Sequence, residues 1–346
     1  MSLDTPARRS RGACRGFRWG FAHSSSVRGA CAGIVLIAFL SMQAAAQSSE
    51  ADGSLVLLLP VGAQSVGMGQ AMVAERPGSE SVWWNPAGLA RLTKREAAIH
   101  HSETLAARGD AITFVLPSKT LGTAALSLNV LDFGNQQITD GTGLPVGLVL
   151  PRNILIAVSY AAAVGSRFSL GLTFKRLQYR VDCSGQCANV STFSAATNAL
   201  DLGVQYEMPA GIPIRLGAAV RNIGSRLELT DGDDADPLPT RIEAGASYGL
   251  KFIEKYVSDV SFRVAADIIA TESAGDASAR FGTVLTYQKT AHLRAGYIAN
   301  DANGANAALG FGLGAGRLVF DIARTFGGLS ADAGKTPAYV SLRYLF

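Results

Sequence analysis

Apolar and polar residues alternate along most of the chain, from about residue 95 to the C-terminal residue 346. In segments 241–251 and 260–270, for example, every even position is apolar, while most odd positions are polar or small. A period of two residues indicates a β-strand with one apolar and one polar face. The pattern therefore predicts that this part of the chain consists almost entirely of strands.

Fourteen strands are predicted in this way, and the connections between them are alternately short and long. Outer-membrane barrels have an even number of antiparallel strands, short periplasmic turns and longer extracellular loops. The longest predicted loops are 135–151, 182–196 and 225–239. We therefore expect an all-β fold, a transmembrane outer-membrane β-barrel of about 14 antiparallel strands, with both ends of the mature chain in the periplasm. The predicted strands are 95–105, 110–118, 122–134, 152–165, 167–181, 197–208, 213–224, 240–251, 257–271, 279–289, 291–300, 306–316, 317–328 and 338–346.

Isolated charges on the second face of nearly every strand favour a barrel over a soluble β-sandwich or propeller. A lipid-facing exterior around a polar interior explains this pattern directly, because a charge facing lipid at mid-depth is costly. The inward charges either hold an inner segment through ion pairs or line a selective channel, and the sequence leaves both roles open. The charges expected in the lumen are Lys175, Asp201, Glu207, Arg215, Arg221, Arg241, Glu243, Lys251, Arg263, Asp267, Arg294, Asp321 and Arg343.

The first 46 residues have the three parts of a secretory signal peptide. Six arginines lie within the first 29 residues, an apolar run covers Ala30–Leu40, and Ala44–Ala46 provides a cleavage site of the A-x-A type. We expect residues 1–46 to be removed. The full chain has 31 Lys+Arg and 27 Asp+Glu, so the loss of six arginines and Asp4 leaves 25 and 26 and makes the mature chain about neutral.

Composition excludes two other classes of protein. The longest apolar run, Ala30–Leu40, is shorter than the roughly 18 residues of a helical membrane span, which argues against a helical membrane protein. The neutral mature chain lacks the broad basic surface through which many proteins bind nucleic acid, so we expect no nucleic-acid partner.

Cys183 and Cys187 are the two cysteines outside the signal peptide, and they lie in the polar sequence C-S-G-Q-C. Because an exported chain folds in an oxidising compartment, we expect a local disulfide between them. A redox or metal pair is the alternative. However, the three intervening residues differ from the C-x-x-C spacing, and no second cysteine or histidine pair is near in sequence.

Residues 60–92 do not alternate, and they contain two short motifs. GAQSVGMGQAMVA covers 62–74 and SVWWNPAGLA covers 81–90. Asn85 followed by Pro86 predicts the N-cap and the first position of a short helix. Together the motifs resemble the N-terminal motif of the PorV/PorQ family, outer-membrane barrels that are similar to the FadL long-chain fatty-acid channels. The residues of the motif are Gly62, Gly67, Gly69, Trp83, Trp84, Asn85, Pro86 and Gly88.

The resemblance implies a hatch, or plug, at residues 47–94 that folds into the lumen and contains a short helix, and a fourteen-stranded barrel at residues 95–346. The chain departs from the family at Gln70, where members often have a further glycine. The two tryptophans of the motif belong either to the hatch or to a periplasmic aromatic belt, and the sequence leaves this open.

Glycines at alternate positions of the predicted strand 306–316 support an interior packed with protein. With its leucines and phenylalanine facing lipid, this strand would turn a glycine stripe toward the lumen and leave space for another segment. Relief of curvature in the closed sheet is the alternative explanation. The glycines of the stripe are Gly310, Gly312, Gly314 and Gly316.

The chain ends in Tyr344-Leu345-Phe346, an apolar final strand closed by an aromatic residue. This ending resembles the signature by which outer-membrane barrels are recognised for assembly. We therefore expect Tyr344 and Phe346 to be recognised by the barrel-assembly machinery.

The sequence offers little for catalysis or metal binding. His100, His101 and His292 are the histidines of the mature chain, and none lies beside a serine in a recognisable constellation. The acidic loop Asp231–Asp236 could offer oxygen ligands to calcium, but it lacks the distal glutamate of an EF-hand loop. We expect no enzyme activity, no cofactor and no metal site.

These expectations lead to two functions. The first is transport, in which a hydrophobic small molecule passes the outer membrane as in FadL-like channels. The second is implied by the resemblance to PorV and is a role in a type IX secretion system, with a secreted protein as the partner. In both cases we expect a monomer surrounded by outer-membrane lipid.

Overall fold

The computed structural model contains one antiparallel sheet that closes into a β-barrel of 14 strands. It describes residues 54–187, 193–209, 211–228, 235, 237–251, 256–271, 277–299, 306–327, 334 and 336–346. The predicted signal peptide and the aspartates of the acidic loop Asp231–Asp236 lie outside the described residues.

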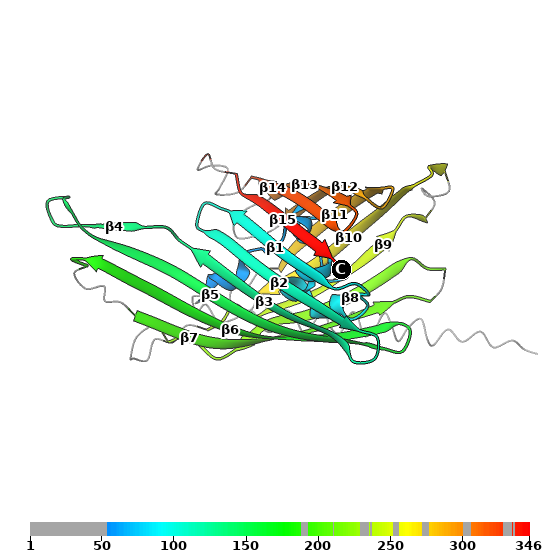
Figure 1. Cartoon of the computed structure of the whole chain (residues 1–346), viewed down its shortest axis with the longest axis horizontal. Helices are drawn as coiled ribbons and strands as arrows, with labels where there is room; N and C mark the ends of the chain where they lie inside the picture. Colours follow the sequence, from blue (N-terminus) through cyan, green and yellow to red (C-terminus); the bar gives the residue numbers. More distant parts are fainter. Residues whose placement is uncertain are drawn as a thin grey trace, which may run out of the picture. The chain divides into compact units, whose positions relative to one another are not determined.

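The strands follow one another around the barrel in chain order, as Figure 1 shows. Their bounds are β1 (Glu96–Glu103), β2 (Arg108–Ser118), β3 (Gly122–Asp132), β4 (Gln136–Thr139), β5 (Pro145–Val164), β6 (Phe168–Gly185), β7 (Phe193–Glu207), β8 (Ile214–Gly224), β9 (Arg241–Gly249), β10 (Val260–Thr271), β11 (Ala277–Tyr287), β12 (Ala291–Ala299), β13 (Asn306–Ala315), β14 (Leu318–Phe326) and β15 (Ala338–Leu345).

The ring closes where the first strand meets the last. β1 runs antiparallel to β15, with Glu96 opposite Leu345. On the other side of the hairpin β2–β3, strand β3 pairs directly with β5, with Thr123 opposite Ala161. The short β4 is therefore not part of the ring and extends the sheet along the end of β5. Ring closure gives the backbone groups of each strand a partner, which the interior of a bilayer requires.

The predicted strands are confirmed, with differences near two of the predicted loops. Residues 135–151 are not one loop, because β4 and the first part of β5 lie there. Likewise, β6 continues to Gly185 and β7 begins at Phe193, inside the predicted loop 182–196. The start of β5 was missed because Pro145 and Pro151 lack the N–H that a strand ladder uses and interrupt the alternation.

Apolar side chains cover the outer face of the barrel. On β6 the outward positions Phe168, Leu170, Leu172 and Phe174 are between 42% and 49% exposed. Outward leucines, phenylalanines and tyrosines occupy similar positions on the neighbouring strands. So much contiguous apolar surface is unusual in a soluble monomer and is typical of the lipid-facing band of a transmembrane barrel.

Strands β5, β6 and β7 have 20, 18 and 15 residues and extend beyond this apolar band. On β6 the outward positions after Phe174 are polar, beginning with Arg176. The extension has a small apolar cluster of its own, formed by Val149, Val181 and Cys187. A disulfide joins Cys183 and Cys187, whose Cα atoms are 6.2 Å apart.

Residues 54–92, which we name the inner segment, pack against the inner face of the strands (Figure 1). The segment contains five short helices, and none of the helices in the described residues is long and apolar enough to span a membrane. Helix α2 contacts β12–β15, while η3 contacts β5–β7, so the segment reaches opposite parts of the wall. The helices are η1 (Leu55–Leu58), α2 (Ala63–Gly67), η2 (Gly78–Glu80), α3 (Ser81–Trp84) and η3 (Pro86–Leu89).

Cysteine labelling tests the predicted orientation of the barrel. A Gly141→Cys substitution in the β4–β5 hairpin is structurally mild, because no atom lies within 4 Å of the added Cβ. We expect a membrane-impermeant maleimide to label it on intact cells. The matched Lys119→Cys variant, in the short β2–β3 turn, should react only after the outer membrane is permeabilised. The reverse result would invert the orientation.

Candidate functional site

Glycines of the motif allow the inner segment to approach the wall backbone to backbone. A Cβ atom on Gly67 would lie 2.9 Å from the Cα atom of Gly310 in β13. Gly69 has a φ of +59°, and a Cβ atom there would lie 2.6 Å from the backbone nitrogen of Tyr297 in β12. Side chains at these positions would push the segment away from the wall. This contact explains why a glycine-rich motif precedes the barrel.

Asn85 anchors the other part of the motif. Its side-chain oxygen accepts a hydrogen bond from Ala87 N at 3.0 Å, and its amide nitrogen donates to Val73 O at 2.6 Å. The predicted N-cap is confirmed, although the helix that it starts, η3, is a single 3₁₀ turn. Gly203 on β7 provides the space, because a Cβ atom there would lie 2.0 Å from the Asn85 oxygen.

The predicted glycine stripe faces the lumen only in part. Gly310 and Gly312 are buried, and Gly310 is the one that packs against the inner segment at Gly67. Gly314 is only partly buried. Placing Gly316 on the stripe was wrong, because it lies in the β13–β14 turn with a φ of +62° and is exposed. The turn needs a residue that adopts a left-handed backbone, which glycine does at little cost.

Inward charges on one side of the lumen are paired at short distances. Lys175 on β6 lies 2.6 Å from Asp201 on β7, and both side chains are almost fully buried. Arg221 on β8 pairs with Glu243 on β9 and also donates to the backbone oxygen of Trp83 at 2.6 Å. Buried charges are stable only when they are paired in this way. The two pairs therefore join four wall strands, and Arg221 links the wall to the inner segment.

A second network lies on the opposite side of the lumen. Asp321 on β14 binds both Arg294 on β12, at 2.7 Å, and Arg343 on β15, at 2.8 Å. The carboxylate of Glu96 on β1 accepts hydrogen bonds from Ser79 N and Ser79 Oγ, at 3.1 Å and 2.6 Å. Here too, wall charges hold each other and the backbone of the inner segment.

One member of the predicted charge set does not belong to the lumen, and two members were missed. Lys251 follows the end of β9 and is exposed. Glu96 and Arg280 are buried inward residues that the prediction omitted, although the alternation of their strands places both on the inner face. Arg280 donates to Gln70 Oε1 at 2.7 Å, so the residue that departs from the family motif has its own partner on the wall.

The two tryptophans of the motif belong to the inner segment, and no aromatic belt includes them. Trp83 and Trp84 are only 6% and 3% exposed. Trp84 Nε1 donates to Val61 O at 3.0 Å, and the guanidinium of Arg221 lies 5.3 Å from the centre of its ring. This distance allows a cation–π contact.

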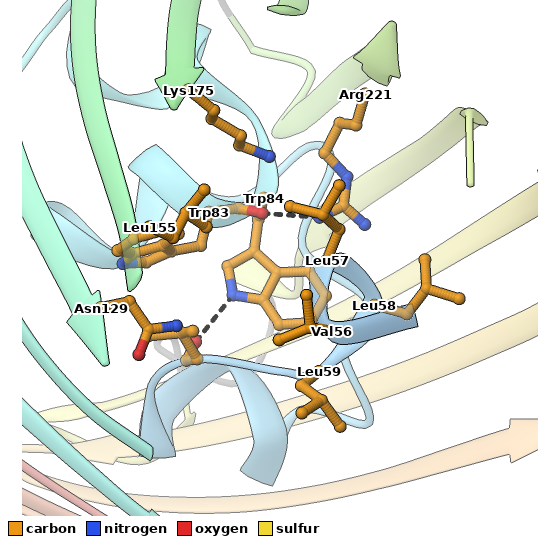
Figure 2. A pocket seen from close by; sticks show the side chains of 11 residues that line it. Val56, Leu57, Leu58, Leu59, Trp83, Trp84, Asn129, Leu155, Lys175 and Arg221 are labelled. Atoms are coloured by element: carbon orange, nitrogen blue, oxygen red, sulfur yellow. Dashed lines mark hydrogen bonds between the residues drawn. The ribbon is translucent and has the colours of Figure 1, made fainter. Parts of the chain in front are cut away.

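A small pocket surrounds Trp84, as Figure 2 shows, with Lys175 and Arg221 on one side and Leu59 opposite. Its other walls are mostly apolar and include Leu57 and Leu155. The space left is enough for about one water-sized molecule. The pocket is this small because the apolar residues of η1 fill the space between the tryptophans and the wall.

One histidine does lie beside a serine, although the two are far apart in the sequence. His100 Nδ1 is 2.8 Å from Ser341 Oγ, across the β1–β15 pairing. Ser341 is fully buried, and its hydroxyl also accepts a hydrogen bond from Ala63 N at 2.9 Å. This serine is therefore engaged in holding the inner segment and is inaccessible to a substrate. Among the described residues, no group of three potential metal ligands lies together.

Aromatic rings lie side by side at the end of the chain. Tyr344 and Phe346 are stacked with their centroids 5.8 Å apart, and both are exposed on the outer face. Their recognition by the assembly machinery stays a prediction.

A glycine substitution tests the backbone contact of the motif. We expect Gly296→Ala on β12 to displace the inner segment, because the added Cβ would lie 1.9 Å from Gly69 N. Such overpacking costs about 1–3 kcal/mol. Trypsin should then cleave the folded barrel after Arg91 faster than in the wild type. The matched Gly249→Ala variant, whose nearest contact is 3.7 Å, should match the wild type, and equal cleavage in both variants would contradict the contact.

The seating of the inner segment should depend on pH through Glu80. Burial raises the pKa of this carboxyl to about 7, although it accepts hydrogen bonds from Ser65 N at 2.8 Å and Gln64 N at 3.2 Å. Because the folded protein prefers the protonated carboxyl, Glu80 stabilises the folded state most below about pH 4.5, and this stabilisation is lost as the pH rises through 7. It amounts to a free energy on the order of 3 kcal/mol.

Hydrogen exchange of the inner segment in the purified barrel measures this effect. Protection should be stronger at pH 5.5 than at pH 8 after correction for intrinsic rates. Glu80→Gln should reduce the difference, while Glu103→Gln on β1 should leave it unchanged. His100 Nδ1 lies 3.9 Å from Glu80 Oε1, so a His100→Gln variant separates its titration from that of Glu80. An unchanged pH dependence in Glu80→Gln would remove Glu80 as the cause.

The barrel is similar in fold to solved hydrocarbon channels. The toluene transporter TodX of Pseudomonas putida is 13% identical, with a TM-score of 0.54 over 86% of this chain and 97% of that chain. The toluene transporter TbuX of Ralstonia pickettii is 12% identical, with a TM-score of 0.52 over 82% and 98%. The CymD monoaromatic hydrocarbon channel is 14% identical, with a TM-score of 0.52 over 86% of this chain and 99% of that chain. Comparisons with protein-family models and with curated proteins give no match. At these identities the likeness establishes the fold.

Proposed function

We propose that the protein is a non-enzymatic outer-membrane barrel of the PorV/PorQ type that passes hydrophobic solutes across the outer membrane, as FadL-like channels do. The observation that carries this proposal is the luminal pocket around Trp84, whose apolar walls lie inside a barrel with an apolar outer band. A closed barrel lets an apolar solute cross without contacting the polar surface layer of the membrane. The solved barrels of the same fold include proteins described as toluene transporters and monoaromatic hydrocarbon channels.

In this proposal the inner segment is the hatch, and its first residues form the movable part. Among the described residues, the backbone hydrogen bonds of Leu57 and Leu59 are local, to Ser54 O and Val56 O. By contrast, Val73 N donates to Asp267 on β10 at 2.8 Å, and Gln205 on β7 donates to Glu75 O at 2.8 Å. Residues 55–59 are thus held mainly by apolar packing, which an apolar solute can replace.

The proposed location follows from the same features. The signal peptide at residues 1–46 exports the chain, and Tyr344 and Phe346 direct it to the barrel-assembly machinery. The protein then lies as a monomer in outer-membrane lipid, with the apolar band in the bilayer and the ends of β5–β7 outside the cell.

A component of a type IX secretion system is the second candidate. The feature that favours it is the extension of β5–β7, which has its own apolar cluster and a disulfide and offers a sheet surface to a secreted protein. Affinity purification of the intact barrel separates the candidates. A secreted protein bound to the extension would support this role, and loss of that partner on removing the tip, residues 184–187, would locate it.

Uptake of the apolar dye N-phenylnaphthylamine tests the transport proposal. Cells that make the protein should take up the dye faster than cells without it. Leu57→Ala should increase the rate by severalfold, because the shorter side chain opens the pocket around Trp84. Leu128→Ala on the outer face of β3 is the matched control and should behave as the wild type.

A polar chromogenic probe shows whether Leu57→Ala merely makes the barrel leak. Its entry should stay at the wild-type rate, because residues 73–79 keep their charged contacts with the wall and still block the lumen. Dye uptake equal to that of cells without the protein, in both the wild type and Leu57→Ala, would falsify the transport function.

A further inference from the structure

We infer that a second cavity, at the turn end of the lumen, binds a small molecule with a phosphate or carboxylate group. The bound oxyanion bridges Arg76 of the inner segment and Arg263 of β10. It thereby fastens the inner segment to the wall. This inference goes beyond the proposed function and does not depend on which solute passes through the barrel.

The cavity has a volume of about 260 Å³ and lies between the inner segment and strands β10, β11, β12 and β15. His292 is at its edge, near the short β11–β12 turn. The side chain of Arg263 is 44% exposed, so the cavity can be reached from solvent at this end. It is separate from the pocket around Trp84, with which it shares no lining residue.

Positive charge dominates the lining. Arg76, Arg263, Arg294 and Arg343 line the cavity, and Glu75 is the one carboxylate among the lining residues. Among the described residues, four carboxylates form ion pairs within 4.0 Å of these four guanidinium groups or of the neighbouring Arg215. They belong to Glu75, Glu96, Glu207 and Asp321. Five guanidinium groups thus share four carboxylates within this distance. Glu80 also acts on Arg343, but burial favours the protonated form of that carboxyl. The remaining positive charge favours an anion, because an uncompensated charge in a partly buried site is costly.

Two guanidinium nitrogens of the lining arginines also lack an acceptor. Arg76 Nη2 and Arg343 Nε are buried and have no hydrogen-bond partner. A buried N–H without an acceptor costs stability, and an oxyanion supplies several acceptor atoms at once. Guanidinium groups bind phosphate and carboxylate through paired, charge-assisted hydrogen bonds. The charge and the free donors therefore indicate the same class of ligand.

The other side of the cavity is apolar, with Met68, Met72 and Val284. Methionine side chains are flexible and fit ligands of irregular shape. The cavity therefore has room for a short apolar substituent on the oxyanion. Two sources share this chemistry, free inorganic phosphate and a small organic acid, and they are distinguished by their affinities.

The position of the arginines gives the site its effect on the inner segment. Arg76 is held at the wall by Gln205 Oε1 at 3.1 Å and by Glu207 at 2.5 Å. Arg263 binds Glu75, the residue that precedes Arg76, at 3.0 Å. An oxyanion between the two arginines adds a further link between the inner segment and the wall. Binding should consequently slow hydrogen exchange of the backbone around Arg76.

Calorimetric titration of the folded, full-length barrel in detergent tests the inference. Inorganic phosphate and butyrate are each added at constant ionic strength. We expect saturable binding with one site per barrel, and affinity at least about tenfold lower in Arg76→Gln and in Arg263→Gln. Arg324→Gln, which removes an outward charge on β14, should bind as the wild type does. Tighter binding of phosphate identifies a free inorganic ligand, and tighter binding of butyrate identifies an organic acid.

Hydrogen exchange of the wild type provides a second measurement that needs no variant. Phosphate or butyrate at saturating concentration should slow the exchange of the backbone amides around Arg76 and leave the exchange at exposed Lys119 unchanged. The inference fails if neither anion binds saturably. It also fails if both arginine variants retain wild-type affinity while heat-modifiable electrophoresis shows that they are folded. Dye uptake does not depend on this site, so failure here and failure of the transport proposal are distinguishable.

Discussion

The close approach of the inner segment to the barrel wall is the contact on which the other luminal interactions depend. Gly67 meets Gly310, and Gly69 meets the backbone of β12, without intervening side chains. Only at this depth can Asp267 accept from Val73 N and Arg221 donate to Trp83 O. Glycine on both sides therefore does more than relieve strain in the sheet, because it fixes how deep the charged anchors of the segment lie.

Membrane and lumen together determine where charge can go. Lipid excludes charge from the outer face, so the strands turn their charged residues inward, and there burial requires partners. Asp321, shared by Arg294 and Arg343, and the pair Lys175–Asp201 meet that requirement within the wall. These short contacts support the role of an ion-pair network. A lining that selects solutes would need such charges to face open water, and these side chains are buried.

The strands could be predicted from the sequence because a two-residue period is a local property. Contacts that depend on ring closure could not. His100 and Ser341 are separated by 241 positions and meet only because β1 pairs with β15. The inward position of Arg280 could have been predicted, because the alternation of its strand places it on the inner face. Its contact with Gln70 could not have been predicted. The motif indicated where the inner segment begins to fold, but neither glycine spacing nor composition could identify which wall glycine faces which residue of the motif.

Two parts of the inner segment are held by different kinds of force, and this difference bears on the proposed transport. Residues 73–79 are anchored by charged and backbone hydrogen bonds, which an apolar solute cannot replace. Residues 55–59 are held by leucine packing around Trp84, and Leu55 is already 58% exposed. Apolar packing is non-directional, so a hydrocarbon can substitute for a leucine side chain at little cost in free energy. An opening confined to residues 55–59 would thus admit apolar molecules while the ionic part of the segment continues to exclude polar ones.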